Sequence, residues 1–457
     1  MGRFTNTYLP WLLIVTNCIL VAFNQSTYDD GDSVVHYLLS KQALSHPHQF
    51  LNFWAKPLFV LLSAPFTYLG FWGMKLFNTL CILGATAFAH RIWKLFYDSN
   101  PLVFWVLAFF SPHIFLSQSS GLTEPLFAFV LIVGIYYTLR EHYIPGLILL
   151  SFLPYVRSEG WVLMVVFVLS LLFLKQWKHL LWLTVGTLVY GIVGQFALDD
   201  FFWMFHQNPY SGVESKYGNG NLFHFVHQLP YLIGWPVFAL LSIGVVLNVW
   251  NIVKNRMSLS AYHYFVLGSF MAILVAHSIF WYMGWFHSFG LKRVLLAVFP
   301  CMLLLAAEGF SLLTSRLPKK LGTSLLLLIV VLFPFSGNKA GFHLPADVQL
   351  TTNQEAVKLA SAWYKESQQP TVVSFGSYYF AEILNVDIDD TNEMILINGV
   401  LEKTIPSGSL VFWDDYFCPS DRGVLEEDIR PDEYDYVRDF VFSRDGKSSR
   451  IAVFRKR

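Results

Sequence analysis

Apolar runs separated by short polar loops recur from the start of this chain to about residue 336. A helix needs about 20 apolar residues to cross a bilayer, and somewhat fewer where its ends are covered by protein. Eleven runs approach this length, the fifth being the shortest: 8–23, 73–90, 102–117, 124–139, 143–156, 160–174, 180–197, 229–250, 262–283, 293–311 and 321–336. They predict an all-α membrane bundle of about eleven transmembrane helices.

The composition excludes an ordinary soluble globular protein. Hydrophobic residues make up 55% of the chain and charged residues only 14%, whereas soluble domains carry about 25% charged residues. A further apolar run, 57–72, is interrupted by Pro57, Pro65 and Gly70. Because proline breaks the interior of a helix, we expect this run to form an interfacial or re-entrant helix.

The last part of the chain has a different character. Residues 341–457 hold 20 of the 31 acidic residues but only 12 of the 31 basic ones, so the preceding part is basic as well as apolar. This contrast predicts two domains, a polytopic transmembrane domain over 1–340 and a soluble α/β domain over 341–457.

Local patterns support an α/β fold for the last part. The segment from Thr352 to Glu355 matches a capping box before a helical run. Residues 371–375 and 408–413 are typical of strands, and 440–454 predicts a hairpin with Asp445 and Gly446 in its turn.

Positive charges mark one side of the predicted bundle. Lys and Arg are enriched in cytoplasmic loops because translocating them is unfavourable. If the N-terminus is cytoplasmic, every loop predicted to lie inside carries basic residues: Arg91, Lys94, Arg140, Lys175, Lys178, Lys254, Arg256, Arg316, Lys319 and Lys320. We therefore expect a multi-pass membrane protein with a cytoplasmic N-terminus and with its C-terminal domain on the extracytoplasmic side.

The first polar loop, residues 28–57, concentrates acidic groups at Asp29, Asp30 and Asp32. His36 is four positions after Asp32, so the two residues would share a face of a helix that begins near Gly31. A carboxylate here could act as a general base on an incoming hydroxyl group. Asp30, Asp32 and His36 could instead hold a divalent cation, and the acids could simply cap an interfacial helix.

Other ionisable residues gather in loops predicted to lie on the same side. Lys56 could hold a lipid phosphate as a point charge or extend to the lipid headgroups. Arg157 has a planar guanidinium that can hold two phosphate oxygens, although it could merely pair with Glu159. Glu124 could cap its helix or take part in catalysis. Further positive charge comes from His287, Lys292 and Arg293.

The order of these motifs resembles the polyprenol-phosphate-dependent glycosyltransferases of the GT-C fold. An acidic pair in the first outer loop is followed by W-x-K-P-L, TEPLF, R-S-E-G-W and a basic pair at the entrance of a late span. The likeness covers about residues 8–336 and is strongest to the protein O-mannosyltransferases and the aminoarabinose transferases of lipid A. Some similarity extends to the mannosyltransferases that build lipid-linked glycans.

The resemblance implies that the catalytic base is Asp29 or Asp30 and that Lys56 contacts the lipid phosphate. The chain departs from the family in its Asp-Asp-Gly-Asp sequence and in having a single proline, Pro57, after the lysine. The choice among the three aspartates therefore stays open at this point.

The activity implied is that of a glycosyltransferase of the bacterial plasma (inner) membrane. It would move a mannose-like or other hexose or pentose sugar from a polyprenyl-phosphate donor to an acceptor hydroxyl on the extracytoplasmic face, inverting the anomeric carbon. The catalytic candidates are Asp29, Asp30, Asp32 and Glu124, with His36 and Glu159 as further loop candidates. The candidates for binding the donor phosphate are Lys56, Arg157, His287, Lys292 and Arg293.

The expected partners are the lipid-linked donor, membrane lipid and a glycan, lipid or protein acceptor, with no nucleic acid. No cofactor is expected apart from the divalent cation already considered. A lipid-linked glycan ligase or polymerase fits the same architecture. A transporter is the alternative from another class, but transporters place their ionisable groups near the bilayer midplane and contain inverted repeats, whereas here the acids lie at span ends.

Overall fold

The computed structural model of the chain divides into two compact units, which we describe separately. It describes residues 8–97, 101–208, 218–254, 260–315, 318–336, 346–367 and 372–457. The first unit, called the helical unit below, comprises the residues up to Asn24 together with His46–Asp347; the second, called the sheet unit, comprises Gln25–Ser45 and Val348–Arg457. The sheet unit is therefore discontinuous in sequence. The predicted boundary at residues 340 and 341 lies outside the described residues.

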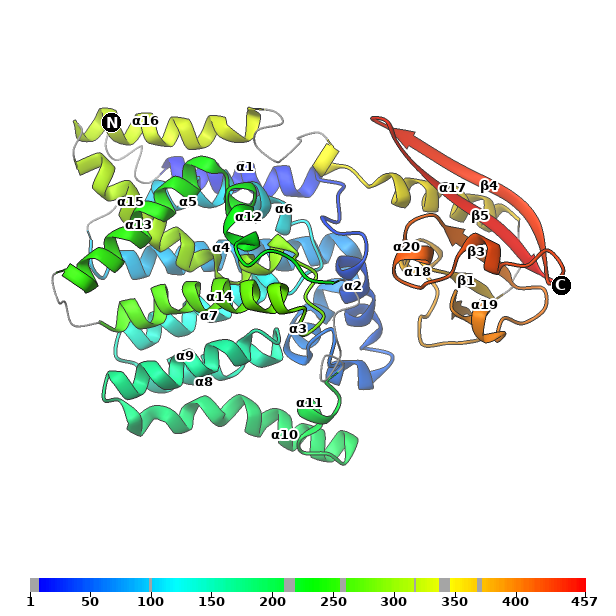
Figure 1. Cartoon of the computed structure of the whole chain (residues 1–457), viewed down its shortest axis with the longest axis horizontal. Coiled ribbons are helices and arrows are strands. Elements are labelled where there is room, and N and C mark those ends of the chain that lie inside the picture. The colour runs from blue at the N-terminus through cyan, green and yellow to red at the C-terminus, as the bar shows by residue number, and fades with distance from the viewer. Residues whose placement is uncertain are drawn as a thin grey trace. The chain divides into compact units, whose positions relative to one another are not determined.

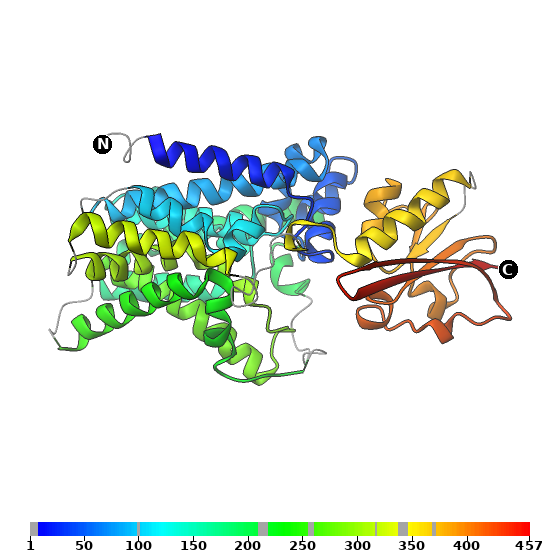
Figure 2. The same ribbon diagram turned by 90° about the horizontal axis from the view of Figure 1, so that it is seen from above.

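The helical unit consists of apolar helices that lie side by side (Figures 1 and 2). Its α-helices are α1 (Leu9–Phe23), α3 (Pro57–Ser63), α4 (Phe71–Trp93), α5 (Pro101–Phe109), α6 (Pro112–Ser117), α7 (Glu124–Leu139), α8 (Tyr143–Ser151), α9 (Gly160–Phe173), α10 (Val185–Leu198), α11 (Trp203–His206), α12 (His224–Ile233), α13 (Trp235–Lys254), α14 (Gly268–Met283), α15 (Phe299–Ser315) and α16 (Lys319–Leu332). Short 3-10 segments cover Pro47–Leu51, Ala64–Leu69, Leu153–Tyr155, Trp177–Thr184, Lys292–Val298 and Phe333–Phe335, and a π-helical turn covers His263–Leu267.

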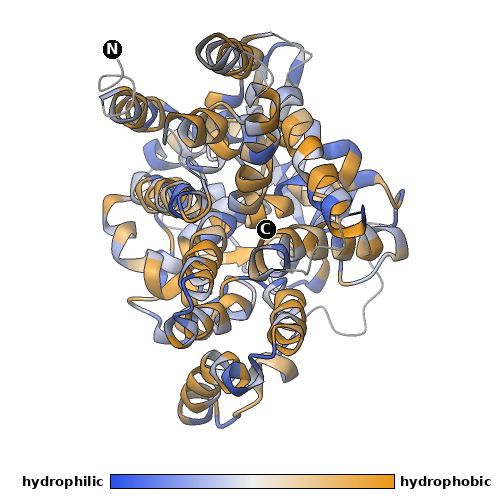
Figure 3. Cartoon of the chain, turned by 90° about the vertical axis from the view of Figure 1, so that its left-hand side faces the viewer, coloured by the Kyte–Doolittle hydropathy of each residue, from blue (hydrophilic) through white to orange (hydrophobic). Residues whose placement is uncertain are grey.

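Many of these helices have the length and apolar character of membrane spans, and hydrophobic residues predominate along them (Figure 3). In the described part of the chain, five helical stretches are long and apolar enough to cross a membrane: Phe71–Trp93, Trp177–Leu198, Trp235–Lys254, His263–Met283 and Lys292–Ser315. Six shorter apolar stretches accompany them: Leu9–Phe23, Pro57–Leu69, Glu124–Leu139, Tyr143–Tyr155, Gly160–Phe173 and Leu321–Phe335. The prediction of an apolar helical bundle is confirmed.

Two predicted spans are divided in the structure. The run 102–117 forms α5 and α6, which are separated just before Pro112, a residue that has no backbone N–H to continue the first helix. The run 229–250 is divided between α12 and α13 at Gly234, whose φ of 85° is readily adopted only by glycine. The expected break in 57–72 is also present, since α3 gives way to a 3-10 segment that ends before Gly70.

Close helix packing in this unit depends on small residues. α13 packs along α15, and a Cβ added to Gly244 would lie 1.9 Å from the backbone oxygen of Leu305. From the opposite helix, a Cβ on Gly309 would lie 2.1 Å from the backbone oxygen of Leu240. Glycines at such positions let the backbones approach closely, as is typical of helix packing in membranes.

The sheet unit is an α/β fold around five strands: β1 (Val373–Phe375), β2 (Met394–Leu396), β3 (Leu410–Asp414), β4 (Tyr434–Arg444) and β5 (Lys447–Lys456). Their order is β2-β1-β3-β5-β4; β1 pairs in parallel with β2 and β3, whereas β5 is antiparallel to β3 and β4. The helices are α2 (Asp32–Gln42), α17 (Thr352–Glu366), α18 (Tyr379–Leu384), α19 (Gly399–Glu402) and α20 (Phe417–Ser420), with a 3-10 turn at Glu426–Asp428.

The local predictions for this unit are largely confirmed. The hairpin of β4 and β5 turns through Asp445 and Gly446, whose φ values of 52° and 74° suit a tight two-residue turn. The predicted capping box is present one residue earlier than expected: Thr351 caps α17 and pairs with Gln354. Because Thr351 and Thr352 are adjacent and each precedes a suitable partner by three positions, the sequence pattern fitted both.

The segment 25–45 is tied to the C-terminal residues along its length. The backbone N–H groups of Gln25 and Ser26 both donate to the carbonyl oxygen of Val348. Further along, the hydroxyl of Tyr37 donates to Glu382, and Lys41 lies 3.4 Å from the same carboxylate. The three aspartates of the first polar loop therefore lie in the sheet unit.

Candidate functional site

In the helical unit, two turns at the starts of α7 and α9 present the central charged residues. α7 begins with Glu124, where the helix dipole favours a carboxylate, followed by a proline that suits the first helical turn. α9 begins at Gly160, where an added Cβ would lie only 2.3 Å from the backbone nitrogen of Pro154. The glycine of the R-S-E-G-W motif therefore allows the tight turn that carries Arg157 and Glu159.

Arg157 lies between two carboxylates. Its Nη1 is 3.0 Å from Glu124 Oε1 and its Nη2 is 2.7 Å from Glu159 Oε1, and Nη1 also donates to Thr123 Oγ1 at 2.8 Å. Burial alone would raise the pKa of Glu159, but the adjacent guanidinium outweighs this effect and holds that pKa well below its usual value. The simpler of the two explanations for Arg157, pairing with Glu159, is thus observed, and Glu124 shares the pairing.

Lys56 is a buried lysine next to this network. Its side chain donates from Nζ to Ser158 Oγ at 2.9 Å, and Nζ lies 3.8 Å from the centre of the Phe53 ring. Only 4% of the residue is exposed, and burial lowers its pKa to about 7, an effect that the charge of Glu159 partly opposes. Among the described residues, Lys56 has no ion pair within 4.0 Å.

The backbone of Lys56 has an unusual conformation. Its φ of 72° lies in a region that residues other than glycine rarely adopt, and such conformations concentrate at functional sites. The turn before it is fixed by Asn52, whose side-chain oxygen accepts from the backbone N–H of Ala55 at 2.9 Å. The loop therefore holds the lysine in place before the chain enters α3.

Other residues of the helical unit extend this charged region. His277 of α14 places Nε2 3.4 Å from Glu159 Oε1, and the buried Arg293 is close enough for its charge to act on Arg157. The charge of Lys292 acts on His113. The remaining phosphate candidate, His287, follows α14 in a loop and has a φ of 51°.

In the sheet unit, Asp29 and Asp30 have different surroundings. Asp29 Oδ1 accepts from the backbone N–H groups of Gly31 and Ser33 at 3.1 and 3.3 Å, which stabilises the start of α2. Asp30 Oδ2 accepts instead from the hydroxyl of Thr351 at 2.8 Å. Burial raises the pKa of Asp30, the bond from Thr351 opposes this rise, and the charge of Asp29 adds to it. Asp29 is thus bonded to the backbone at the start of α2, whereas Asp30 is bonded to a side chain 321 positions later in the chain.

A third carboxylate supports the loop that carries Asp30. Asp414, the last residue of β3, is fully buried and accepts from the backbone N–H groups of Tyr416 and Phe417. Its charge also raises the pKa of Asp30. The ring of Phe417 lies against Gly31, where an added Cβ would be 3.3 Å from Phe417 Cε1.

The metal-binding alternative is not favoured by the geometry. His36 Nδ1 lies 2.6 Å from the backbone oxygen of Asp32, so the two residues share a helix face as predicted, but the contact does not involve the carboxylate. Among the described residues, Asp30, Asp32 and His36 do not bring one ligand atom each to within 4.8 Å of one another. The described structure therefore does not group these three residues as a cation site.

Sequence reasoning missed four partner residues. Ser158 was inside the R-S-E-G-W motif, and Thr351 was one position before the predicted capping box, so both had a local signal. Asp414 lies in the acidic and aromatic segment 413–423 and could not be distinguished there from Asp415. His277 lies in an apolar run, where an ionisable residue is itself a signal of function.

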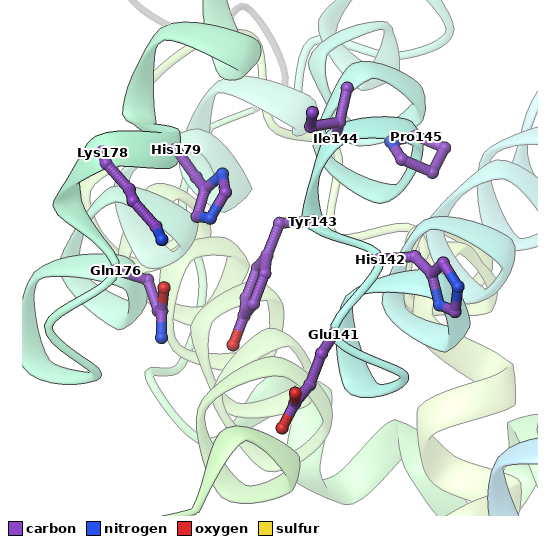
Figure 4. Close-up of a pocket in the computed structure, with 8 residues that line it drawn as sticks. All are labelled: Glu141, His142, Tyr143, Ile144, Pro145, Gln176, Lys178 and His179. Carbon is purple, nitrogen blue, oxygen red and sulfur yellow. The ribbon is translucent and has the colours of Figure 1, made fainter.

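A hollow of about 470 Å³ lies elsewhere in the helical unit (Figure 4), and the rings of Tyr143 and His179 in its lining stack with their centres 4.7 Å apart. It follows the ends of α7 and α9, whereas Glu124 and Glu159 are at their starts, so it is a helix length away from the Arg157 network. None of the predicted site residues is among those that line it: Glu141, His142, Tyr143, Ile144, Pro145, Gln176, Lys178 and His179.

Comparison with known proteins identifies the fold. No protein-family model and no curated protein sequence matches the chain. Among solved structures, it is similar to ArnT from Cupriavidus metallidurans bound to undecaprenyl phosphate, with a TM-score of 0.63 and 12% sequence identity over 98% of both chains. The apo state of the same protein gives a TM-score of 0.61 and 12% identity over 96% of this chain and 97% of that one. The chain therefore has a GT-C fold like that of ArnT. The motif order predicted this fold for about residues 8–336, and the similarity to the solved structures extends over the C-terminal α/β part as well.

Proposed function

We propose that the protein is a membrane glycosyltransferase that transfers a sugar from a polyprenyl phosphate to an acceptor hydroxyl on the extracytoplasmic face, with inversion of the anomeric carbon. The observation that carries this proposal is the agreement of fold, over 98% of both chains, with ArnT bound to undecaprenyl phosphate. Two groups of the chain itself have the properties that such a reaction needs. They are the buried side chain of Lys56 and the carboxylate of Asp30, which accepts a hydrogen bond from Thr351.

The buried cation is Lys56, which we assign to the donor phosphate. A lysine with one hydrogen bond, to Ser158, has two further N–H groups with which it can bind an anion. Because burial disfavours an uncompensated ammonium ion, a phosphate bound here would restore the charge balance that the protein itself leaves incomplete. This electrostatic stabilisation would act most strongly on the departing phosphate, where negative charge develops.

We assign the Arg157 network to organising Lys56 rather than to binding phosphate directly. Arg157 is already paired with Glu124 and Glu159, and a third anion would have to compete with both carboxylates. Ser158, the partner of Lys56, stands between Arg157 and Glu159 in sequence. The ion pairs thus fix the turn from which Ser158 reaches the lysine, while Arg293 contributes positive charge nearby.

We propose that Asp30, whose carboxylate accepts a hydrogen bond from Thr351, is the general base. A base works best when its pKa lies near the operating pH, and burial together with Asp29 moves the pKa of Asp30 upward. Asp29 instead accepts two backbone hydrogen bonds at the start of α2, and Asp32 lies within the first turn of that helix. Asp30 is therefore the aspartate best suited to accept a proton.

The reaction then follows in one displacement. The acceptor oxygen attacks the anomeric carbon and forms the new glycosidic bond while its proton passes to the carboxylate of Asp30. The bond between the anomeric carbon and the phosphate oxygen breaks, and its electron pair stays with that oxygen. The products are the glycosylated acceptor and polyprenyl phosphate, whose negative charge Lys56 stabilises.

The test is a donor-consumption assay with the purified full-length protein in lipid nanodiscs. A panel of synthetic hexosyl and pentosyl polyprenyl monophosphates is incubated with fractionated lipid, glycan and protein acceptors, and release of polyprenyl phosphate is measured by mass spectrometry. We expect one sugar in the panel to be consumed, and Asp30→Asn and Lys56→Gln each to abolish or strongly reduce consumption.

The matched control for Lys56 is Lys75→Gln. Lys75 is another buried lysine of the helical unit, but its side chain donates to the backbone oxygen of Asn24 and not to Ser158. Consumption of a polyprenyl diphosphate glycan in place of every monophosphate donor would favour a ligase or polymerase. If neither class of donor is consumed by a folded sample, the proposal is wrong.

A further inference from the structure

The hydroxyl of Thr351 makes two hydrogen bonds, as the acceptor in one and as the donor in the other. As the N-cap of α17, its oxygen accepts from the backbone N–H of Gln354 at 3.2 Å. The single hydroxyl hydrogen is then directed to Asp30 Oδ2 at 2.8 Å. Because the carboxylate can only accept, this geometry favours its deprotonated form.

The turn that contains Thr351 also holds the chain on the N-terminal side of Asp30. The side chain of Gln354 donates to Thr27 Oγ1 at 2.9 Å, and the carbonyl oxygen of Val348 accepts from two backbone N–H groups of residues 25 and 26. On the other side, Gly31 rests against the ring of Phe417. The orientation of Asp30 is thus determined by residues more than 300 positions later in the chain.

We infer that Thr351 is a positioning residue of the transfer reaction: its hydroxyl holds the carboxylate of Asp30 in the orientation in which it accepts the proton of the acceptor. This inference rests on the proposed function, because it assigns Thr351 a role only through the base. It also gives the sheet unit a direct part in the chemistry, since Thr351 begins the first helix of its C-terminal part.

The position of Thr351 at a helix start adds to this effect. The N-terminus of α17 carries partial positive charge, which favours a nearby carboxylate. The groups that act in the opposite direction on Asp30 are the carboxylates of Asp29 and Asp414, and Tyr416 is the remaining titratable neighbour whose charge is coupled to it. Asp29, Asp414 and Tyr416 are all acidic groups, whereas Thr351 is uncharged and donates a hydrogen bond to Asp30.

The experiment compares Thr351→Val with Thr351→Ser in the full-length protein. Val has nearly the shape of Thr but no hydroxyl, whereas Ser keeps the hydroxyl. We expect Thr351→Val to lower the transfer rate by between about tenfold and 10²-fold, the cost of a misplaced catalytic group, and to move the ascending limb of the pH–rate profile to higher pH. Thr351→Ser should restore both the rate and the profile.

The matched control is Thr352→Val. Thr352 is the next residue of the same turn, but its hydroxyl pairs with Ser449 Oγ at 2.8 Å and not with Asp30. We expect this variant to transfer sugar at the wild-type rate with an unchanged pH profile. An equal loss in Thr351→Val and Thr352→Val, without a change in profile, would show that the turn has only a structural role and would overturn the inference.

Loss of the helix cap in Thr351→Val is separated from loss of the bond to Asp30 by a double-mutant cycle. At neutral pH, Thr351→Val should lower the thermal unfolding temperature more in the wild-type protein than in an Asp30→Asn background, where the charged acceptor is absent. Equal effects in both backgrounds would overturn the inference. Because this measurement needs no substrate, it tests the Thr351–Asp30 pairing even if the wild-type protein consumes no donor and the proposed function fails.

Discussion

Lys56 Nζ lies 2.9 Å from Ser158 Oγ, which joins two motifs that are 102 positions apart in the sequence. On one side is the loop that precedes α3, and on the other is the turn that precedes α9. Because Ser158 is flanked by both members of the Arg157–Glu159 ion pair, the lysine and the ion pair depend on the same turn.

The affinity for a lipid phosphate is expected to depend on the protonation of Lys56. With a pKa lowered to about 7, the lysine is charged below that pH and loses its charge as the pH rises through it. Binding of undecaprenyl phosphate should therefore weaken above pH 7, by up to about tenfold per pH unit. Native mass spectrometry or thermophoresis between pH 6 and 9 measures this dependence.

Lys56→Arg is the reference for that measurement. Arginine stays charged throughout this range, and the phosphate titrates equally in both samples, so the difference between the two profiles reports the lysine alone. Parallel profiles for the wild-type and Lys56→Arg proteins would contradict the assignment of Lys56 to the phosphate.

Removal of the Arg157 guanidinium should be strongly destabilising. Arg157→Met leaves the carboxylates of Glu124 and Glu159 buried without their partner, and breaking a buried ion pair in this way costs about 3–5 kcal/mol. We expect a large fall in thermal unfolding temperature in detergent. Combining Arg157→Met with Glu124→Gln and Glu159→Gln removes the unpaired charges and should recover much of the loss; a triple variant as unstable as the single one would argue against the ion pairs.

Asp30→Asn should stabilise the protein at neutral pH while abolishing transfer. The folded-state pKa of Asp30 is raised above its usual value, so the folded protein binds a proton there more readily than the unfolded chain. Stability is therefore lost as the pH rises through the folded-state pKa, and a neutral amide avoids this loss. The gain in unfolding temperature should be present at pH 7 and shrink as the pH falls.

Asp29→Asn serves as the comparison for Asp30→Asn, because an asparagine oxygen can still accept the N–H groups of Gly31 and Ser33. We expect a folded protein that retains transfer. An inactive Asp29→Asn beside a fully active Asp30→Asn would exchange the roles of the two aspartates.

Gly160→Ala should disrupt the turn that carries Arg157. The added Cβ would lie 2.3 Å from the backbone nitrogen of Pro154, where no flexible side chain can move away. We expect poor yield of folded protein and weakened phosphate binding. Gly268→Ala is the control, since its Cβ would have only ordinary contacts beginning at 3.5 Å, and alanine is the better helix former by about 1 kcal/mol; equal behaviour of the two variants would contradict the prediction.

Much of the fold could be predicted from periodicity and turn chemistry. The apolar runs identified the helical unit, and Asp445 with Gly446 identified the β4–β5 hairpin, because both signals are local. The interruption between α5 and α6 could have been expected from Pro112, but the overall hydrophobicity of 102–117 concealed it. Local signals of this kind specify single helices and hairpins, but they do not specify which residues distant in sequence will contact them.

The candidate site was less predictable for the same reason. The motifs identified Lys56, Glu124, Arg157 and Glu159, which the helical unit does bring together. Whether Arg157 would face a phosphate or two carboxylates depended on the positions of two helix starts, which no spacing in the sequence reveals. The difference between Asp29 and Asp30 likewise depended on Thr351, 321 positions after Asp30.

Residues 25–45 belong to the sheet unit, so during synthesis they are made long before the rest of that unit. The aspartates leave the ribosome early, but Thr351 and Glu382, whose side chains bond to residues of this segment, are made only when the C-terminal part of the sheet unit emerges. Until then, Asp30 has no Thr351 to orient it, and α2 has no Glu382 with which to pair. A chain interrupted before this point would already contain the apolar helices of the helical unit, yet the proposed base would lack its partner. The proposed activity would therefore be acquired only near the end of translation.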